Sequence, residues 1–131
     1  MLSILHRKTT LADCGLLDGF IDRHSHILPD VDDGFRTTDE SIEALRMMET
    51  YGVKEVWLTP HIMEDIPNTT ESLRQKYTAL CEAYNGNIRL HLAAENMIDC
   101  LFSERWGNED LLTMDDRHLL VETSYFNPPL N

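Results

Sequence analysis

One short stretch, residues 20–34, constrains this chain more than any other. Six side chains that can bind metal ions fall within twelve residues of it: Asp22, His24, His26, Asp30, Asp32 and Asp33. The apolar run before them predicts a strand, and the Pro, Asp and Gly residues that follow favour a loop. Alternate residues of a strand point to the same side, so His24 and His26 can aim both imidazoles at one point. Because imidazoles and carboxylates bind zinc, iron and manganese, the stretch predicts half of a metal site.

The rest of the sequence predicts an α/β fold in which strands and helices alternate. Strands are expected within residues 16–23, 53–59, 88–94 and 119–122. Helices are expected after a capping box formed by Thr37 and Glu40, from about Thr69 to the Asn-Gly at 85–86, and, as a short helix or ordered loop, over 96–106. This alternation is typical of βα units with parallel strands, whose right-handed crossovers bring all the carboxyl ends of the strands to one edge.

Two more metal-capable residues follow predicted strands. His61 comes directly after the second strand and Glu95 after the third. Sites of parallel α/β folds form at the carboxyl edge of the sheet, so His24, His26, His61 and Glu95 are expected to meet there. A lone histidine or glutamate at a strand end is often only structural, and this alternative stays open for His61 and Glu95. His91 lies inside a strand and is expected to be a packed histidine.

Three motifs in order resemble those of the PHP (polymerase and histidinol phosphatase) superfamily. They are His-Ser-His-Ile-Leu-Pro-Asp-Val-Asp-Asp-Gly at 24–34, Leu-Thr-Pro-His at 58–61 and Ala-Ala-Glu at 93–95. The branch that they resemble most is the bacterial tyrosine-protein phosphatases of capsule and exopolysaccharide synthesis. The resemblance implies a distorted (β/α)7 TIM-like barrel, about half of it present here, with a lead-in over residues 1–18 and a PHP domain over 19–131. The family's later motifs, a His-Pro-Glu-Arg-like segment and an Asp-x-His, are absent from this sequence, so we expect a domain truncated before its C-terminal motifs.

The resemblance also implies roles for individual residues. The expected metal ligands are His24, His26, Asp33, His61 and Glu95, and the expected catalytic residues are Asp22, His24, His26 and Glu95. The alternative for Asp33 is simple turn chemistry, because Asp-Gly is a common turn dipeptide. Two roles stay open for Asp22, which could accept a hydrogen bond from a ligating imidazole or act as a base. Glu122 and Ser124, at the end of the fourth strand, are weak candidates for a substrate or supporting role.

By resemblance, the function is metal-dependent hydrolysis of phosphotyrosine on a protein, typically a tyrosine kinase that regulates capsule or exopolysaccharide synthesis. The expected cofactors are two or three divalent ions of manganese, iron or zinc, which activate phosphate esters and water toward each other. No cysteine lies in a Cys-x5-Arg loop, which argues against a cysteine nucleophile. Two alternatives stay open: a non-catalytic half-domain that binds metal or a partner, and a hydrolase of small phosphomonoesters such as histidinol phosphate.

Composition narrows the remaining function classes. The net charge of −12 disfavours binding to a nucleic-acid backbone. The sequence has no apolar run of about 18 residues, so no transmembrane helix is expected. The three cysteines, Cys14, Cys81 and Cys100, are widely spaced, which indicates free thiols and a cytoplasmic location. We expect weak or no activity from this chain unless a second copy, as in a homo-oligomer, or another chain completes the barrel.

Overall fold

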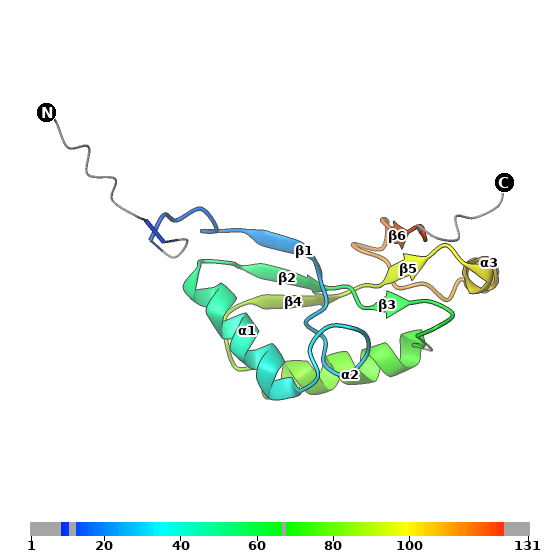
Figure 1. The fold of residues 1–131 in the computed structure, drawn as a ribbon, viewed down its shortest axis with the longest axis horizontal. Helices are drawn as coiled ribbons and strands as arrows, with labels where there is room; N and C mark the ends of the chain where they lie inside the picture. Colours follow the sequence, from blue (N-terminus) through cyan, green and yellow to red (C-terminus); the bar gives the residue numbers. More distant parts are fainter. Residues whose placement is uncertain (1–8, 11–12, 67, 125–131) are drawn as a thin grey trace, which may run out of the picture.

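The structure is a computed structural model that describes residues 9–10, 13–66 and 68–124. The elements in chain order are β1 (Ile21–Ser25), α1 (Thr38–Thr50), β2 (Glu55–Leu58), β3 (His61–Ile62), α2 (Thr70–Ala83), β4 (Arg89–Leu92), β5 (Glu95–Met97), α3 (Cys100–Gly107) and β6 (Leu120–Glu122). The strands form two parallel sheets, in the orders β1-β2-β4 and β3-β5-β6. Helices α1 and α2 lie on the same side of the first sheet (Figure 1).

The second sheet continues the first along the same strand directions. Partners in the β2–β4 pair of the first sheet and in the β3–β5 pair of the second are both separated by 34 residues, as Glu55 pairs with Arg89 and His61 with Glu95. Only two residues separate β2 from β3, and one of them, Pro60, has no N–H to contribute to a ladder. Backbone bonds from Ala93 to Leu58 and from Glu95 to Pro60 connect the sheets across this break. His61 and Glu95 therefore stand side by side where the first sheet passes into the second.

The helices begin and end as their sequences predict. Thr37 caps α1, and the Glu40 carboxylate accepts the backbone N–H of Thr37 at 2.9 Å, which completes the capping box. Thr69 caps α2 in the same way with Ser72. After α1, Gly52 adopts a φ of +91°, and a Cβ there would meet the Cα of Asp18 at 2.8 Å, so only glycine fits.

A single large core lies between the two helices and the first sheet. Its most buried side chains come from all of these elements: Leu45 of α1, Leu73 and Leu80 of α2, and Val56 and Leu58 of β2. The opposite face of the sheet carries a small second cluster of Trp57, Ala93 and Met114. The core thus fixes the sheet from the helix side.

An irregularity in β1 changes which side chains share a face. Asp22 pairs with Val56 and Ser25 pairs with Leu58, so β1 advances three residues while β2 advances two. This is a β-bulge, in which residues 23 and 24 together stand opposite Trp57.

The two sheets do not close into a barrel within the described residues, so the TIM-like barrel, of which about half was expected, is not shown. Two other expectations from the sequence need correction. Residues 95–97 form the strand β5 instead of beginning a helix or loop, because they pair with both β3 and β6. The first strand covers Ile21–Ser25, and the residues before it, 13–19, make turns. Much of the predicted lead-in and most of the predicted loop over 124–131 lie outside the described residues.

Candidate metal centre

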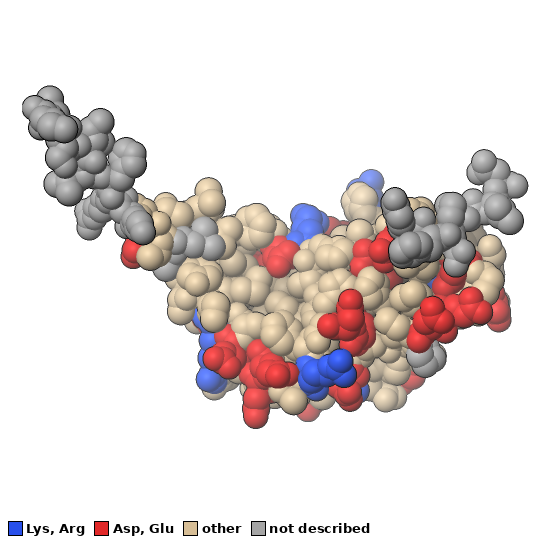
Figure 2. Space-filling view, in the orientation of Figure 1, with Lys and Arg blue, Asp and Glu red and all other residues tan. Residues whose placement is uncertain are grey.

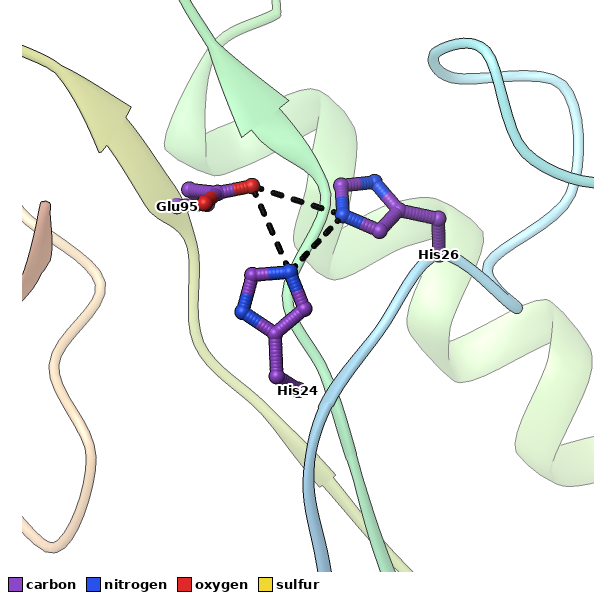
Figure 3. A group of neighbouring side chains, drawn as sticks. All are labelled: His24, His26 and Glu95. Atoms are coloured by element: carbon purple, nitrogen blue, oxygen red, sulfur yellow. Dashed lines mark hydrogen bonds and ion pairs between the residues drawn. The ribbon is translucent and has the colours of Figure 1, made fainter. Parts of the chain in front are cut away.

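The strand ends bring two imidazoles and one carboxylate of the first motifs together. The Oε2 atom of Glu95 lies 3.5 Å from Nε2 of His24 and 3.4 Å from Nε2 of His26, and the two Nε2 atoms are 3.2 Å apart (Figure 3). The histidines come from β1 and the residue after it, and Glu95 is the first residue of β5. Two nitrogens and an oxygen facing one point form the kind of donor set that divalent transition ions prefer.

His61 adds a third imidazole from β3. Its Nδ1 atom lies 3.2 Å from Oε2 of Glu95 and 3.7 Å from Oε2 of Glu122. This nitrogen is buried, yet it makes no hydrogen bond within the described part of the chain. A buried polar atom without a partner is unfavourable. A cation shared between the imidazole and the two carboxylates would satisfy it, so the residues present fit a metal ion.

The donor atoms form three overlapping groups, in each of which they lie within 4.8 Å of one another. These groups are His24, His26 and Glu95; His26, Asp33 and His61; and His61, Glu95 and Glu122. All five predicted ligands therefore lie in one cluster. Because the groups share His26, His61 and Glu95, the geometry is compatible with more than one ion.

Asp32, next to the predicted ligand Asp33, supports the cluster from behind. Its fully buried carboxylate accepts the Nδ1–H of His26 at 2.8 Å and the backbone N–H of His61 at 3.0 Å, and it also accepts the N–H of Gly34. The bond to Nδ1 selects the tautomer in which Nε2 of His26 has a free lone pair toward Glu95. One carboxylate thus orients a ligand of β1 and the backbone of β3.

The surroundings shift the pKa values of both members of this pair. The hydrogen bond to Asp32 raises the pKa of His26, although burial lowers it, and the charges of Asp32, Glu95 and Asp33 raise it further. Burial would raise the pKa of Asp32, but the hydrogen bonds from His26, Gly34 and His61 hold this pKa below its ordinary value. Asp32 is therefore a carboxylate and not a neutral acid at physiological pH.

Asp22 and His91 lie outside the donor groups. The Asp22 carboxylate accepts the backbone N–H of His24 at 3.2 Å, so the acceptor that orients an imidazole is Asp32 and not Asp22. His91 stacks on Trp57 with ring centroids 4.6 Å apart and contacts Glu55 through Nε2 at 3.0 Å, as expected for a packed histidine.

Sequence reasoning gave too little weight to Asp32 and Glu122. Glu122 is the last residue of β6 and pairs with Met97, two residues after Glu95, and its Oε2 lies 3.7 Å from Nδ1 of His61. Its position at the end of a predicted parallel strand was the signal that could have identified it. For Asp32 no sequence signal separates it from its neighbours Asp30 and Asp33.

Comparison with known families and structures identifies the group to which the chain is similar. Residues 20–128 match the family model described as capsular polysaccharide synthesis, CpsB/CapC. The chain is 30% identical over 107 residues to a protein of Staphylococcus aureus named "Putative tyrosine-protein phosphatase CapC"; the match covers 78% of this chain and 42% of CapC.

A solved structure agrees in fold. It is one of the crystal structures of YwqE from Bacillus subtilis and CpsB from Streptococcus pneumoniae, described as unique metal-dependent tyrosine phosphatases, and it superposes with a TM-score of 0.68 at 26% identity. The match covers 80% of this chain and 44% of the other. The chain thus spans less than half of the length of either relative. Since the family model matches most of the sequence, the chain belongs to the CpsB/CapC family of capsular polysaccharide synthesis.

Proposed function

We propose that this chain carries a metal centre of a protein-tyrosine phosphatase in capsule or exopolysaccharide synthesis. The observation that carries the proposal is the cluster of His24, His26, His61 and Glu95, brought together from β1, β3 and β5. The relatives support the reaction class, because they are named as tyrosine phosphatases and the crystallised ones as metal-dependent. The open parallel sheets are compatible with about half of a PHP-type (β/α)7 barrel, which is part of the proposal.

Two or three divalent ions, of manganese, iron or zinc, are the proposed cofactors. The overlapping donor groups would hold them through His24, His26, Asp33, His61, Glu95 and Glu122. Bound ions of this kind act as Lewis acids toward phosphoryl oxygens and lower the pKa of water.

The remaining chemistry belongs to the protein. Asp32 keeps the proton of His26 on Nδ1, so that Nε2 stays available at the centre. Glu95 faces three imidazoles with one oxygen and is placed to be shared between ions. We assign Asp22 to the catalytic group as a candidate base, since it lies in β1 two residues before His24. The substrate would be a phosphotyrosine protein, and we propose a polysaccharide-synthesis tyrosine kinase.

Hydrolysis by the purified chain tests this proposal. The chain is loaded with Mn²⁺, Fe²⁺ or Zn²⁺ in turn, bound metal is counted by elemental analysis, and rates are measured on a phosphotyrosine peptide and on histidinol phosphate. We expect at least two ions per chain and a preference for the phosphotyrosine peptide.

A matched pair of histidine variants separates the centre from general effects. His61→Ala should abolish hydrolysis and lower the metal content, whereas His118→Ala, an exposed histidine outside the cluster, should change neither. Metal binding without hydrolysis by the chain, even in a homo-oligomer, would support a non-catalytic half-domain, and a preference for histidinol phosphate would support the small-molecule alternative. Either result would contradict the proposed function.

A further inference from the structure

We infer that Arg23 binds the phosphoryl group of a substrate at the metal centre and that Asp115 competes with that group for the Arg23 guanidinium. The inference rests on the proposed function, because it adds the phosphate contact to the proposed reaction.

The bulge in β1 brings Arg23 to the side of the site. In a regular strand Arg23 and His24 would point to opposite faces. Here both stand opposite Trp57, which lies on the face of the sheet that carries the second, smaller cluster. The Arg23 side chain agrees with this placement, since its Nη1 lies 3.7 Å from Oδ2 of Asp115, and Asp115 follows Met114 of that cluster in the chain. Asp115 also lines a hollow of about 570 Å³ together with Trp57, His91 and, from α2, Arg74. Arg23 is thus a cation on the face that carries Trp57, next to the metal-centre residue His24 in sequence.

Solvent reaches the centre at three of its donor side chains. His24 is 46% exposed, Asp33 78% and Glu122 42%, whereas His26, His61 and Glu95 are 22% exposed or less. The Arg23 side chain, next to His24 in sequence, is 61% exposed. A phosphate ester that enters from solvent at His24 would therefore approach the residue whose neighbour carries an exposed guanidinium.

Arg23 is a cation in surroundings that are mostly acidic. The centre itself presents the carboxylates of Asp33, Glu95 and Glu122, and acidic side chains predominate over basic ones on the face seen in Figure 2. A doubly charged phosphoryl group needs a compensating cation there besides the ions. A guanidinium suits this role because its planar N–H groups match phosphate oxygens in a bidentate contact.

The ion pair of Arg23 is weak enough to exchange. The 3.7 Å contact with Asp115 joins two side chains that are both more than half exposed, and such pairs contribute little. By contrast, Lys76 contacts Asp30 at 2.9 Å, and Arg89 makes a closer contact with Glu55. A phosphoryl group held at the centre can thus replace Asp115 at modest cost.

Asp115 is nevertheless held in place. It lies in a tight turn closed by backbone bonds from Met114 to His118 and from His118 to Met114, and Met114 is buried against Trp57 and Ala93. Its φ of +52° is in the left-handed region that non-glycine residues rarely adopt. The turn keeps the carboxylate near Arg23, as a competitor for phosphate requires.

Calorimetric titration of inorganic phosphate into the Mn²⁺-loaded chain tests the inference, with Mn²⁺ binding measured separately for each variant. Arg23→Gln should weaken phosphate binding roughly tenfold or more, as expected for the loss of a charge-assisted hydrogen bond, and leave Mn²⁺ binding unchanged. The phosphate affinity of Arg23→Lys should lie between those of the unmodified chain and of Arg23→Gln, because lysine keeps the charge but cannot make the bidentate contact. The matched control is Arg89→Gln, because Arg89 of β4 is also an exposed arginine in an ion pair. Its phosphate affinity should stay within about twofold of that of the unmodified protein, because the charge of Arg89 is screened at physiological salt.

The competitor is tested separately. Asp115→Asn should tighten phosphate binding by up to about fivefold, the range of an exposed ion pair. Asp116→Asn is the control: Asp116 lines the same hollow, but Asp115 makes the ion pair with Arg23. Asp116→Asn should have the smaller effect.

Equal phosphate affinities for Arg23→Gln and Arg89→Gln, or no phosphate binding by the Mn²⁺-loaded unmodified chain, would overturn the inference. Hydrolysis of the phosphotyrosine peptide is scored on its own. An Arg23→Gln variant that hydrolyses the peptide with unchanged KM contradicts the inference and leaves the proposed function intact. Phosphate binding that depends on Arg23 without any hydrolysis contradicts the proposed function instead.

Discussion

The buried carboxylate of Asp32 connects two of the segments that build the metal centre. It contacts the His26 ring and the backbone N–H groups of His61 and Gly34, so all its contacts lie within or next to the site. Partners of this kind orient ligating imidazoles and raise their basicity. At the scale of single residues, the geometry of the centre therefore depends on a side chain that is not itself one of the donor groups.

Replacing Asp32 tests this dependence. Asp32→Asn should lower the affinity for Mn²⁺ or Zn²⁺ by about 10- to 100-fold, because the amide cannot accept all the hydrogen bonds that the carboxylate accepts. Isothermal titration calorimetry measures the change, and Asp65→Asn, an exposed aspartate in the turn after β3, is the control. Equal affinities for the two variants would show that Asp32 does not support the centre.

A second prediction at the residue scale concerns Glu122, which lies 3.7 Å from the unpartnered Nδ1 of His61. Glu122→Gln should reduce the number of bound ions per chain or weaken the last one, and leave the group of His24, His26 and Glu95 able to bind. Elemental analysis after dialysis measures the content. Glu82→Gln, on an exposed face of α2, should keep the full content; an unchanged content in Glu122→Gln would remove Glu122 from the ligand set.

At the scale of elements, short interruptions deliver the functional side chains. The bulge in β1 places residues 23 and 24 on one face, and the breaks at Pro60 and at residues 93–94 let β3 and β5 begin with His61 and Glu95. Each interruption is a departure from regular pairing, and each coincides with a residue of the site. The regular helices serve a different purpose, since they cover the far face and hold the strands in register.

The cap of α1 gives a prediction at this scale. Thr37→Ala should lower the free energy of unfolding by about 1 kcal/mol, the usual cost of losing an N-cap side chain. Urea denaturation monitored by circular dichroism measures the change. Thr38→Ala is the control, because Thr38 is the first residue of α1 and not its cap.

The same cap predicts that the stability of the fold depends on pH. Hydrogen bonds from the backbone and side chain of Thr37 and from the backbone of Arg36 lower the pKa of Glu40 below 4.5. A lowered pKa in the folded state means that the carboxylate stabilises the fold above pH 4.5 and that this stability is lost as the pH falls through the lowered pKa. Glu40→Gln should therefore flatten the stability profile in this acid range relative to Glu43→Gln, an exposed glutamate of the same helix. If the stability of the two variants changed with pH in the same way, the result would contradict the lowered pKa of Glu40.

At the scale of the whole molecule, the donor cluster joins the two sheets. Its residues come from β1 and the loop after it in the first sheet and from β3, β5 and β6 in the second. In the described part of the chain, each sheet has three strands. None of the helices described there is long and apolar enough to span a membrane. Bound ions would act as cross-links between the two halves of the strand layer.

Removal of the metal tests whether bound ions cross-link the two sheets. A ligand that binds only the folded state at 100 times its Kd stabilises that state by about 2.7 kcal/mol. For a chain of this size, saturating Mn²⁺ should therefore raise the Tm by roughly 10 °C above the value in EDTA, as measured by differential scanning calorimetry. His24→Ala should lose most of this shift and His118→Ala should keep it. A shift that persists in His24→Ala would place the stabilising ion elsewhere.

Several features of the fold follow from local chemistry, and these the sequence predicts well. The capping residues Thr37 and Thr69, the helix end at Gly52 and the side-chain period of two at His24 and His26 act over a few neighbouring residues. Their backbone conformations depend on steric and hydrogen-bonding rules that hold without the rest of the chain. The approach of His61 and Glu95 was also predictable, because parallel strands align their carboxyl ends.

Other features depend on contacts between distant segments. Asp32 became the supporting carboxylate because the strand pairing brings the His61 backbone N–H to it, 29 residues away in sequence. The strand β5 exists because β3 and β6 flank it, and Glu122 enters the site through that pairing. Arg23 faces the site only because β1 bulges against β2. The sequence by itself thus determined which donor groups the chain possesses and which strand ends carry them. Tertiary structure alone decided which of its many carboxylates and cations face the centre, because register and bulges arise from pairing between strands and not from any one segment.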